Sequence, residues 1–125
     1  MNLVLLKVTT TGADGAAVGS VETGVPVYGE IKAVVLDYHA SAPNTTDVEL
    51  YMTTTPSYLI LNCDNKNTDI ALHPRKQSCN NAGTLLTLDG TREKTESYAV
   101  AGQLTLAVAE CDALTDAVTA WIFYE

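Results

Sequence analysis

The chain is poor in charged residues, has only three cysteines and has no long apolar run. Each of these shortages excludes a class of protein or a structural feature. Charged residues make up 18% of the 125 residues and hydrophobic residues 46%, a balance that excludes an intrinsically disordered acidic tail. The uncharged apolar runs are short, as at residues 33–36 and 120–124, so we expect no segment that spans a membrane. Residues 1–7 lack the basic start and long apolar stretch of a signal peptide, so secretion by that route is not expected.

Basic residues are also scarce. Seven lysines and arginines stand against fifteen acidic residues, which gives a net charge of −8. A surface this acidic repels phosphate backbones, so we expect no nucleic-acid partner. A chain of 125 residues has the length of one domain and can bury a core without a disulfide or a metal. We therefore expect a single domain over residues 1–125 that needs no cofactor to fold.

Good helix formers are few, whereas threonine is the dominant polar residue, with seventeen copies. No window has the apolar periodicity of a helix, and alternation with a period of two recurs along the chain. Pro, Gly, Asn and Asp clusters separate the alternating segments at intervals of roughly eight to twelve residues. The expected strands cover residues 3–8, 16–27, 30–39, 47–53, 58–63, 70–73, 84–88, 97–100, 103–109 and 117–124. The pattern predicts an all-β, antiparallel β-sandwich, either a jelly roll or a β-tulip, with a barrel as the alternative.

The three cysteines, Cys63, Cys79 and Cys111, form no CxxC pair, and their odd number does not suit a disulfide framework. We expect buried, reduced thiols, with a Cys63–Cys79 bridge across the intervening loop as the alternative. Zinc would need four clustered ligands, and the cysteines together with His73 have no recognised spacing. The sequence predicts no metal site here.

Two segments contain residue types that are typical of active sites or ligand-binding sites. Asp37 and His39 share one face of a strand and could form part of a triad with Ser41 or Ser57. The chain lacks a nucleophile elbow and a glycine-rich oxyanion loop, so we expect no catalysis. The loop at residues 64–69 offers carboxylates and amides but fails the EF-hand template, and a simple turn is the expected structure.

Charge is unevenly distributed along the chain. Five of the seven basic residues lie between residues 64 and 95, whereas the first 50 residues hold six acids and two lysines. Four of the five form a basic cluster: Arg75, Lys76, Arg92 and Lys94. Either these charges are scattered and solvated, or their loops converge into a contact patch for an acidic protein surface.

The last strand carries large side chains on both of its faces. In residues 121–124 Trp121 and Phe123 point one way, and Ile122 and Tyr124 point the other way. Either both faces are covered within the monomer, or Trp121 and Phe123 meet another subunit.

Two stretches carry a resemblance to a known group of proteins. They are residues 29–48 (GEIKAVVLDYHASAPNTTDV) and residues 97–109 (SYAVAGQLTLAVA), the latter followed by DALTDAVT at residues 112–119. The chain resembles the small β-rich virion proteins of tailed bacteriophages that decorate or cement the head beside the major capsid protein. The resemblance implies a compact β-sandwich or β-tulip, often trimeric, seated over junctions between capsomers. It also implies that residues 1–12 act as an arm or an edge strand, and it brings no catalytic residues.

The resemblance therefore predicts a structural protein rather than an enzyme. It would decorate and cement a tailed-phage capsid by bridging neighbouring major capsid protein subunits. It would be made in the host cytoplasm, lie on the outer surface of the virion, form a homo-oligomer (a trimer is favoured) and contact neither nucleic acid nor membrane. The alternatives are a tail or head-fibre component and a carbohydrate-binding β-sandwich module. The residues expected in the interface are Leu3, Val4, Leu5, Leu6, Arg75, Lys76, Arg92, Lys94, Trp121, Phe123 and Tyr124.

Overall fold

The computed structural model describes residues 1–125 and contains eleven strands and no helix, which confirms the predicted all-β class. No helix of the length and apolarity needed to cross a membrane is present. The strands are β1 (Asn2–Val8), β2 (Ala17–Glu22), β3 (Val27–Tyr38), β4 (Asp47–Met52), β5 (Thr55–Cys63), β6 (Ile70–Leu72), β7 (Arg75–Gln77), β8 (Thr95–Ser97), β9 (Ala99–Gly102), β10 (Leu104–Cys111) and β11 (Val118–Tyr124).

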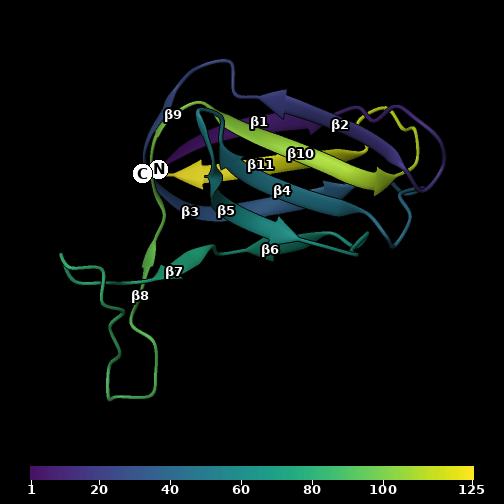
Figure 1. Ribbon diagram of the computed structural model, residues 1–125. Coiled ribbons are helices and arrows are strands. Elements are labelled where there is room, and N and C mark those ends of the chain that lie inside the picture. Colours follow the sequence, from purple (N-terminus) through teal and green to yellow (C-terminus); the bar gives the residue numbers. More distant parts are fainter.

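The strands form two antiparallel sheets that lie face to face (Figure 1). The first sheet has the order β1-β11-β3-β6, with β9 paired to the beginning of β3, and the second has the order β2-β10-β4-β5. A separate two-stranded ribbon consists of β7 and β8. With β7, β8 and β9 set aside, the first strand pairs with the last, the second with the seventh, the third with the sixth and the fourth with the fifth. This nested pairing is the strand order of a jelly roll.

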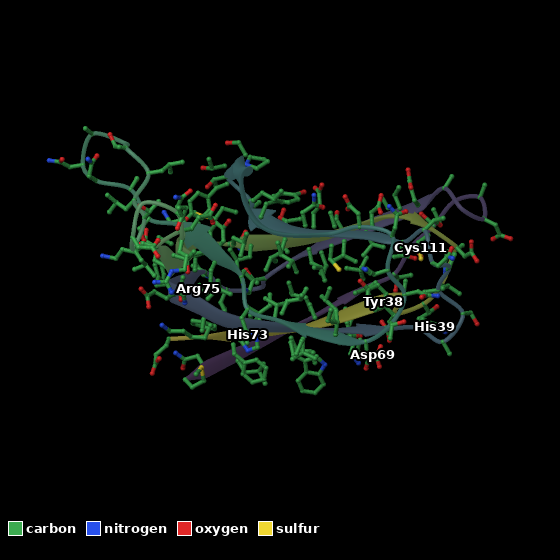
Figure 2. All side chains as sticks on the ribbon, turned by 90° about the horizontal axis from the view of Figure 1, so that it is seen from below. Tyr38, His39, Asp69, His73, Arg75 and Cys111 are labelled. Carbon is green, nitrogen blue, oxygen red and sulfur yellow. The ribbon has the colours of Figure 1, made fainter.

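One hydrophobic core of 22 buried residues fills the space between the two sheets (Figure 2). Alternation explains its composition, because every second residue of a strand points to the same side. In β1 the inward residues are Val4, Leu6 and Val8, as the sequence pattern predicts. Leu36 of β3 and Leu106 of β10 are fully buried in the two facing sheets.

Buried threonines tie the strands to the loops. The Thr10 hydroxyl donates to the carbonyl of Asp112 and accepts from the backbone N–H of Leu114 at 3.0 Å. The Thr23 hydroxyl accepts from the backbone N–H of Leu104 at 3.1 Å. No buried side-chain nitrogen or oxygen lacks a hydrogen-bond partner. The abundance of threonine therefore supplies polar groups that are small enough for the core edge and fully satisfied there.

The prediction of a strand over residues 84–88 is wrong. That stretch makes only the isolated bridges Cys79↔Leu85 and Thr87↔Glu93. Its leucines Leu85 and Leu88 are each 62% exposed, because no sheet lies beneath this segment to bury either of its faces. An apolar segment between two turns therefore does not form a strand of the sandwich where the supporting layer is missing.

The first residues form an edge strand rather than a free arm. All seven residues of β1 pair with β11, from Asn2↔Tyr124 to Val8↔Val118. The chain then crosses toward the second sheet, where Thr11 exchanges two backbone hydrogen bonds with Val18 at 3.0 Å each. This stretch thereby closes one corner of the sandwich.

Candidate interaction surfaces

The N-terminal strand and the aromatic end, predicted separately as contact sites, lie side by side. In the β1–β11 register Leu3 is opposite Phe123 and Leu5 is opposite Trp121. On the other side of β11, Trp121 is opposite Val35 of β3. Leu3 is 49% exposed, Leu5 43% and Trp121 40%, so these side chains cover the outer side of the first sheet and not its core side.

We call this surface the apolar face. Its outward residues come from β1, β11, β3 and β6, and they are Leu3, Leu5, Ala33, Val35, Ala71, Trp121 and Phe123. Charged residues lie at its ends: Lys7 and Asp37 form a row with Thr119 across β1, β11 and β3, and the ion pair of Glu30 and Lys32 lies at the other end of β3. A contiguous exposed apolar surface of this kind marks an interaction site.

The set of contact residues predicted from the sequence was too broad at both ends of the chain. Leu6 is buried, and Val4 and Tyr124 pack against the core. Because residues alternate between the two sides of a strand, only every second residue of the predicted segments points away from the core. Three residues of the apolar face, Ala33, Val35 and Ala71, were not predicted from the sequence, although the apolar residues on both sides of residues 30–39 were a signal for the first two.

A second surface is a hairpin that extends from the end of the sandwich, residues 74–97, which we call the projecting hairpin (Figure 1). At its base β7 pairs with β8, from Arg75↔Ser97 to Gln77↔Thr95. Beyond the base, backbone hydrogen bonds hold it, including Ser78 N–H to the Lys94 carbonyl at 2.7 Å. The segment has almost no buried side chains, so its own hydrogen bonds and turns maintain its shape.

All four residues of the predicted basic cluster lie on the projecting hairpin, but acids neutralise part of their charge. Lys76 forms an ion pair with Glu96 at 3.6 Å, and Arg92 forms one with Asp89 at 2.8 Å. Arg75 donates to the hydroxyl and carbonyl oxygens of Thr95. The hairpin carries four basic and three acidic residues, whereas the rest of the chain carries three basic and twelve acidic residues. Acids therefore do not dominate on the projecting hairpin as they do in the rest of the chain taken together.

The tip of the projecting hairpin is held by the Asp89 carboxylate. It accepts hydrogen bonds from the backbone N–H groups of Arg92 and Thr91 at 2.8 and 3.1 Å, and from the Thr91 hydroxyl at 3.0 Å. It also accepts from Nε of Arg92 at 2.8 Å. These bonds, with the backbone N–H of Arg92 first, favour the ionised form and lower the pKa of Asp89 from 3.8 to about 2.

We expect the hairpin tip to loosen in acid. Because the folded-state pKa of Asp89 is depressed, its carboxylate stabilises the turn above pH 3.8, and this stabilisation is lost as the pH falls through about 2. NMR titration of the carboxyl carbon should give a pKa near 2, with faster amide exchange at Thr91 and Arg92 over the same interval. An Asp89→Asn variant should lose the pH dependence. An ordinary pKa for Asp89 would contradict the turn described here.

Two of the residues considered for catalysis or metal binding accept hydrogen bonds from the backbone. Nδ1 of His39 accepts from the backbone N–H of Ser41 at 3.0 Å. The Asp69 carboxylate accepts from the backbone N–H of Tyr38 at 2.8 Å, and these residues lie at the opposite end of the sandwich from Arg75 (Figure 2). No group of three or more His, Cys, Asp or Glu side chains is placed to hold a metal ion.

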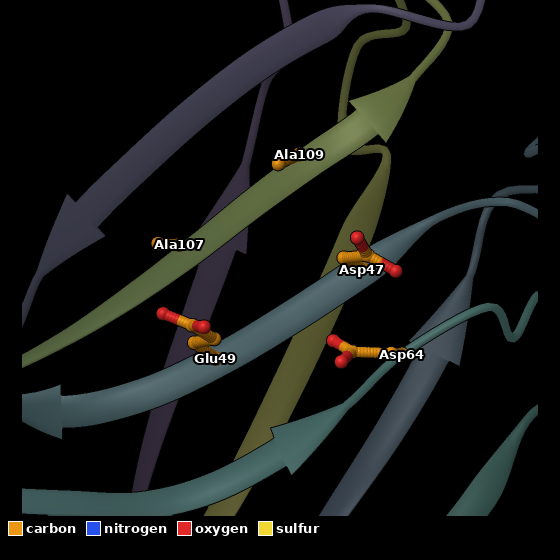
Figure 3. A pocket seen from close by; sticks show the side chains of 5 residues that line it. All are labelled: Asp47, Glu49, Asp64, Ala107 and Ala109. Atoms are coloured by element: carbon orange, nitrogen blue, oxygen red, sulfur yellow. The ribbon is translucent and has the colours of Figure 1, made fainter.

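A shallow hollow of about 210 Å³ lies on the outer side of the second sheet (Figure 3). Its floor is formed by Ala107 and Ala109 of β10, and its rim carries Asp47, Glu49 and Asp64. The Asp47 carboxylate already accepts from the backbone N–H of Asn65 at 2.9 Å. The lining holds three carboxylates and two alanines, with no basic side chain or hydroxyl group beside them.

All three cysteines are free, so the alternative of a Cys63–Cys79 bridge is not formed. Cys63 and Cys111 are buried as predicted, and the Tyr38 hydroxyl donates to Sγ of Cys63 at 3.7 Å. Burial of this hydroxyl raises the pKa of Tyr38 above its usual range. The prediction that Cys79 is buried was wrong, because Cys79 lies exposed on the projecting hairpin.

Comparisons with protein-family models, curated proteins and solved structures find no match to this chain. Its function therefore has to be argued from its own surfaces. Two stand out: the apolar face on the first sheet and the projecting hairpin at the end of the sandwich.

Proposed function

We propose that this chain is a structural protein of a tailed-phage virion that decorates the capsid and cements neighbouring major capsid protein subunits. The observation that carries the proposal is the apolar face, where Leu3, Leu5 and Trp121 are between 40% and 49% exposed. Contiguous apolar side chains on the solvent side of a sheet are typical of a surface that another protein covers. The resemblance of residues 29–48 and 97–119 to decoration proteins supplies the identity of the partner.

A cementing protein must hold two neighbours at once, and this chain has two separate surfaces for doing so. The apolar face supplies an aromatic anchor, Trp121, among smaller apolar residues, as in the centre of protein interfaces. The projecting hairpin reaches away from the sandwich (Figure 1). We assign it to the contact with a second subunit. A contact of about 1,000 Å² per copy suffices for specific binding, and many copies on one shell act together. The role requires neither turnover nor a cofactor.

The two surfaces differ in their expected dependence on salt. Lys94 and Arg75 of the projecting hairpin have no acidic partner within the chain at salt-bridge distance, so they are free to steer the hairpin toward an acidic surface. Salt screens such contacts but leaves the burial of apolar area largely intact. We therefore assign anchoring to the apolar face and orientation to the hairpin.

The proposal is tested by binding the purified protein to phage heads that lack it. Trp121→Glu should weaken binding at physiological salt about thirtyfold, because it places a charge at the centre of a dehydrated contact. The matched control is Val18→Glu, since Val18 is 55% exposed on a strand of the other sheet. This variant should bind as the unmodified protein does. Co-sedimentation with the heads measures both, and circular dichroism verifies that each variant is folded.

Failure of the unmodified protein to bind such heads at physiological salt would overturn the proposal. Binding to tails or fibres in place of heads would favour the alternative of a tail or head-fibre component. Specific binding on a glycan array, abolished by Trp121→Glu and not by Val18→Glu, would favour a carbohydrate-binding module.

A further inference from the structure

The four edges of the sandwich are not equally protected against pairing with another chain. The β6 edge is three residues long and is followed closely by Pro74. The β5 edge contains Pro56 and has two shifts in its register with β4. The β2 edge is covered at Val18 by Thr11. Short length, proline, bulges and covering segments are the usual means of protecting an edge from intermolecular pairing.

The β1 edge has none of these protections. Its seven residues pair with β11 in unbroken register, contain no proline and pair with no other strand. The backbone groups of residues 2–7 that point away from β11 have no hydrogen-bond partner within the chain. Such a row of unpaired N–H and C=O groups is a template for one more strand.

The charge on β1 favours a second copy of this chain as that strand. The molecule carries a net charge of −8, so two copies repel one another across most of their surfaces. The sequence of β1, NLVLLKV, contains no acidic residue and a single base, Lys7. At this edge two identical chains can approach without bringing carboxylates together.

We infer that β1 pairs antiparallel with β1 of a second copy around a two-fold axis that passes at Leu5. In this register Leu5 faces its own counterpart, Val4 faces Leu6 and Leu3 faces Lys7. Inward residues therefore meet inward residues and outward residues meet outward residues, as a shared sheet requires. The two Lys7 residues lie about 14 Å apart along the strands. That exceeds the roughly 8 Å over which charges interact strongly at physiological salt.

The pairing merges the first sheets of two copies into one continuous sheet. The apolar faces then adjoin, because Leu3 and Leu5 lie next to the axis and Trp121 lies one strand away in each copy. The same surface patch serves both copies, which is the form that two-fold dimers take. This arrangement replaces the three-fold association that the resemblance implies. It does not rest on the proposed function, because it is tested on the chain alone.

Sedimentation of the purified full chain tests the inference. The unmodified protein should sediment at twice the chain mass of 13.3 kDa. Leu5→Lys should sediment as a monomer, since it places two ammonium groups opposite one another across the axis. Ala71→Lys is the matched control, because Ala71 is exposed on the same side of the sheet but on its opposite edge strand. This variant should remain a dimer.

A mixing experiment separates loss of pairing from loss of folding. Leu5→Glu alone should also be monomeric, and an equimolar mixture with Leu5→Lys should recover dimers through the opposite charges at the axis. Such recovery requires that residue 5 of one copy face residue 5 of the other. Monomers or trimers of the unmodified chain at tens of micromolar, or dimers of folded Leu5→Lys, would overturn the inference, as would no recovery on mixing.

Discussion

Replacing Gly29 with alanine is expected to lower the free energy of unfolding by about 3 kcal/mol. Gly29 has a φ of +134°, a backbone conformation that side chains with a Cβ rarely adopt. A Cβ at this position would also meet the backbone carbonyl of Glu125. That carbonyl cannot easily move, since Glu30 and Glu125 exchange two backbone hydrogen bonds of 2.9 Å each. Strain and overlap therefore act together at one residue.

Urea denaturation followed by circular dichroism measures this loss, with Gly24→Ala as the control. Gly24 has an ordinary φ, and no atom lies within 4 Å of the position of an added Cβ. Its replacement should leave stability unchanged or raise it slightly, because alanine restricts the unfolded chain. Equal stabilities of the two variants would refute the strained contact at Gly29.

Leu106→Ala is expected to destabilise the protein by a similar amount, about 3 kcal/mol. Leu106 lies on β10, between Val21 of β2 and Leu50 of β4, and its side chain is completely buried. Truncation removes apolar burial and leaves a cavity in the middle of the second sheet, where neighbours on both sides are fixed by hydrogen bonds.

Two further variants show whether the loss comes from the cavity. Leu106→Met preserves volume and should cost less than about 1.5 kcal/mol. Leu85→Ala removes the same atoms from a side chain that is 62% exposed on the projecting hairpin, and it should change stability by at most about 0.5 kcal/mol. The same denaturation curves report all three, and a small effect of Leu106→Ala would mean that β10 is not at the centre of the core.

Most strands could be predicted because each has one side in the core. The predicted segments at residues 30–39, 47–53 and 103–109 correspond to β3, β4 and β10. In each, burial of alternate residues imposes the period of two that the sequence displays. Short turns rich in Pro, Asn, Asp and Gly separate them, so their ends were also nearly correct.

The partners of these strands could not be predicted, and neither could the surfaces that depend on them. Leu5 and Trp121 lie opposite one another although more than a hundred residues separate them in the chain. No local pattern encodes such a pairing, because it follows from how the whole sandwich closes. The prediction for the projecting hairpin failed for a different reason. The apolar residues Leu85 and Leu88 suggested that a second sheet covers this segment, and no such sheet is present.

The position of β11 between β1 and β3 has a consequence for synthesis on the ribosome. β1 emerges first but has no strand to pair with until residues 118–124 have been made, and the first sheet stays divided until then. Such high contact order slows folding to milliseconds or seconds and leaves apolar strands open to aggregation meanwhile. The apolar residues of β1 therefore stay without their partner strand, and open to aggregation, until β11 has been made.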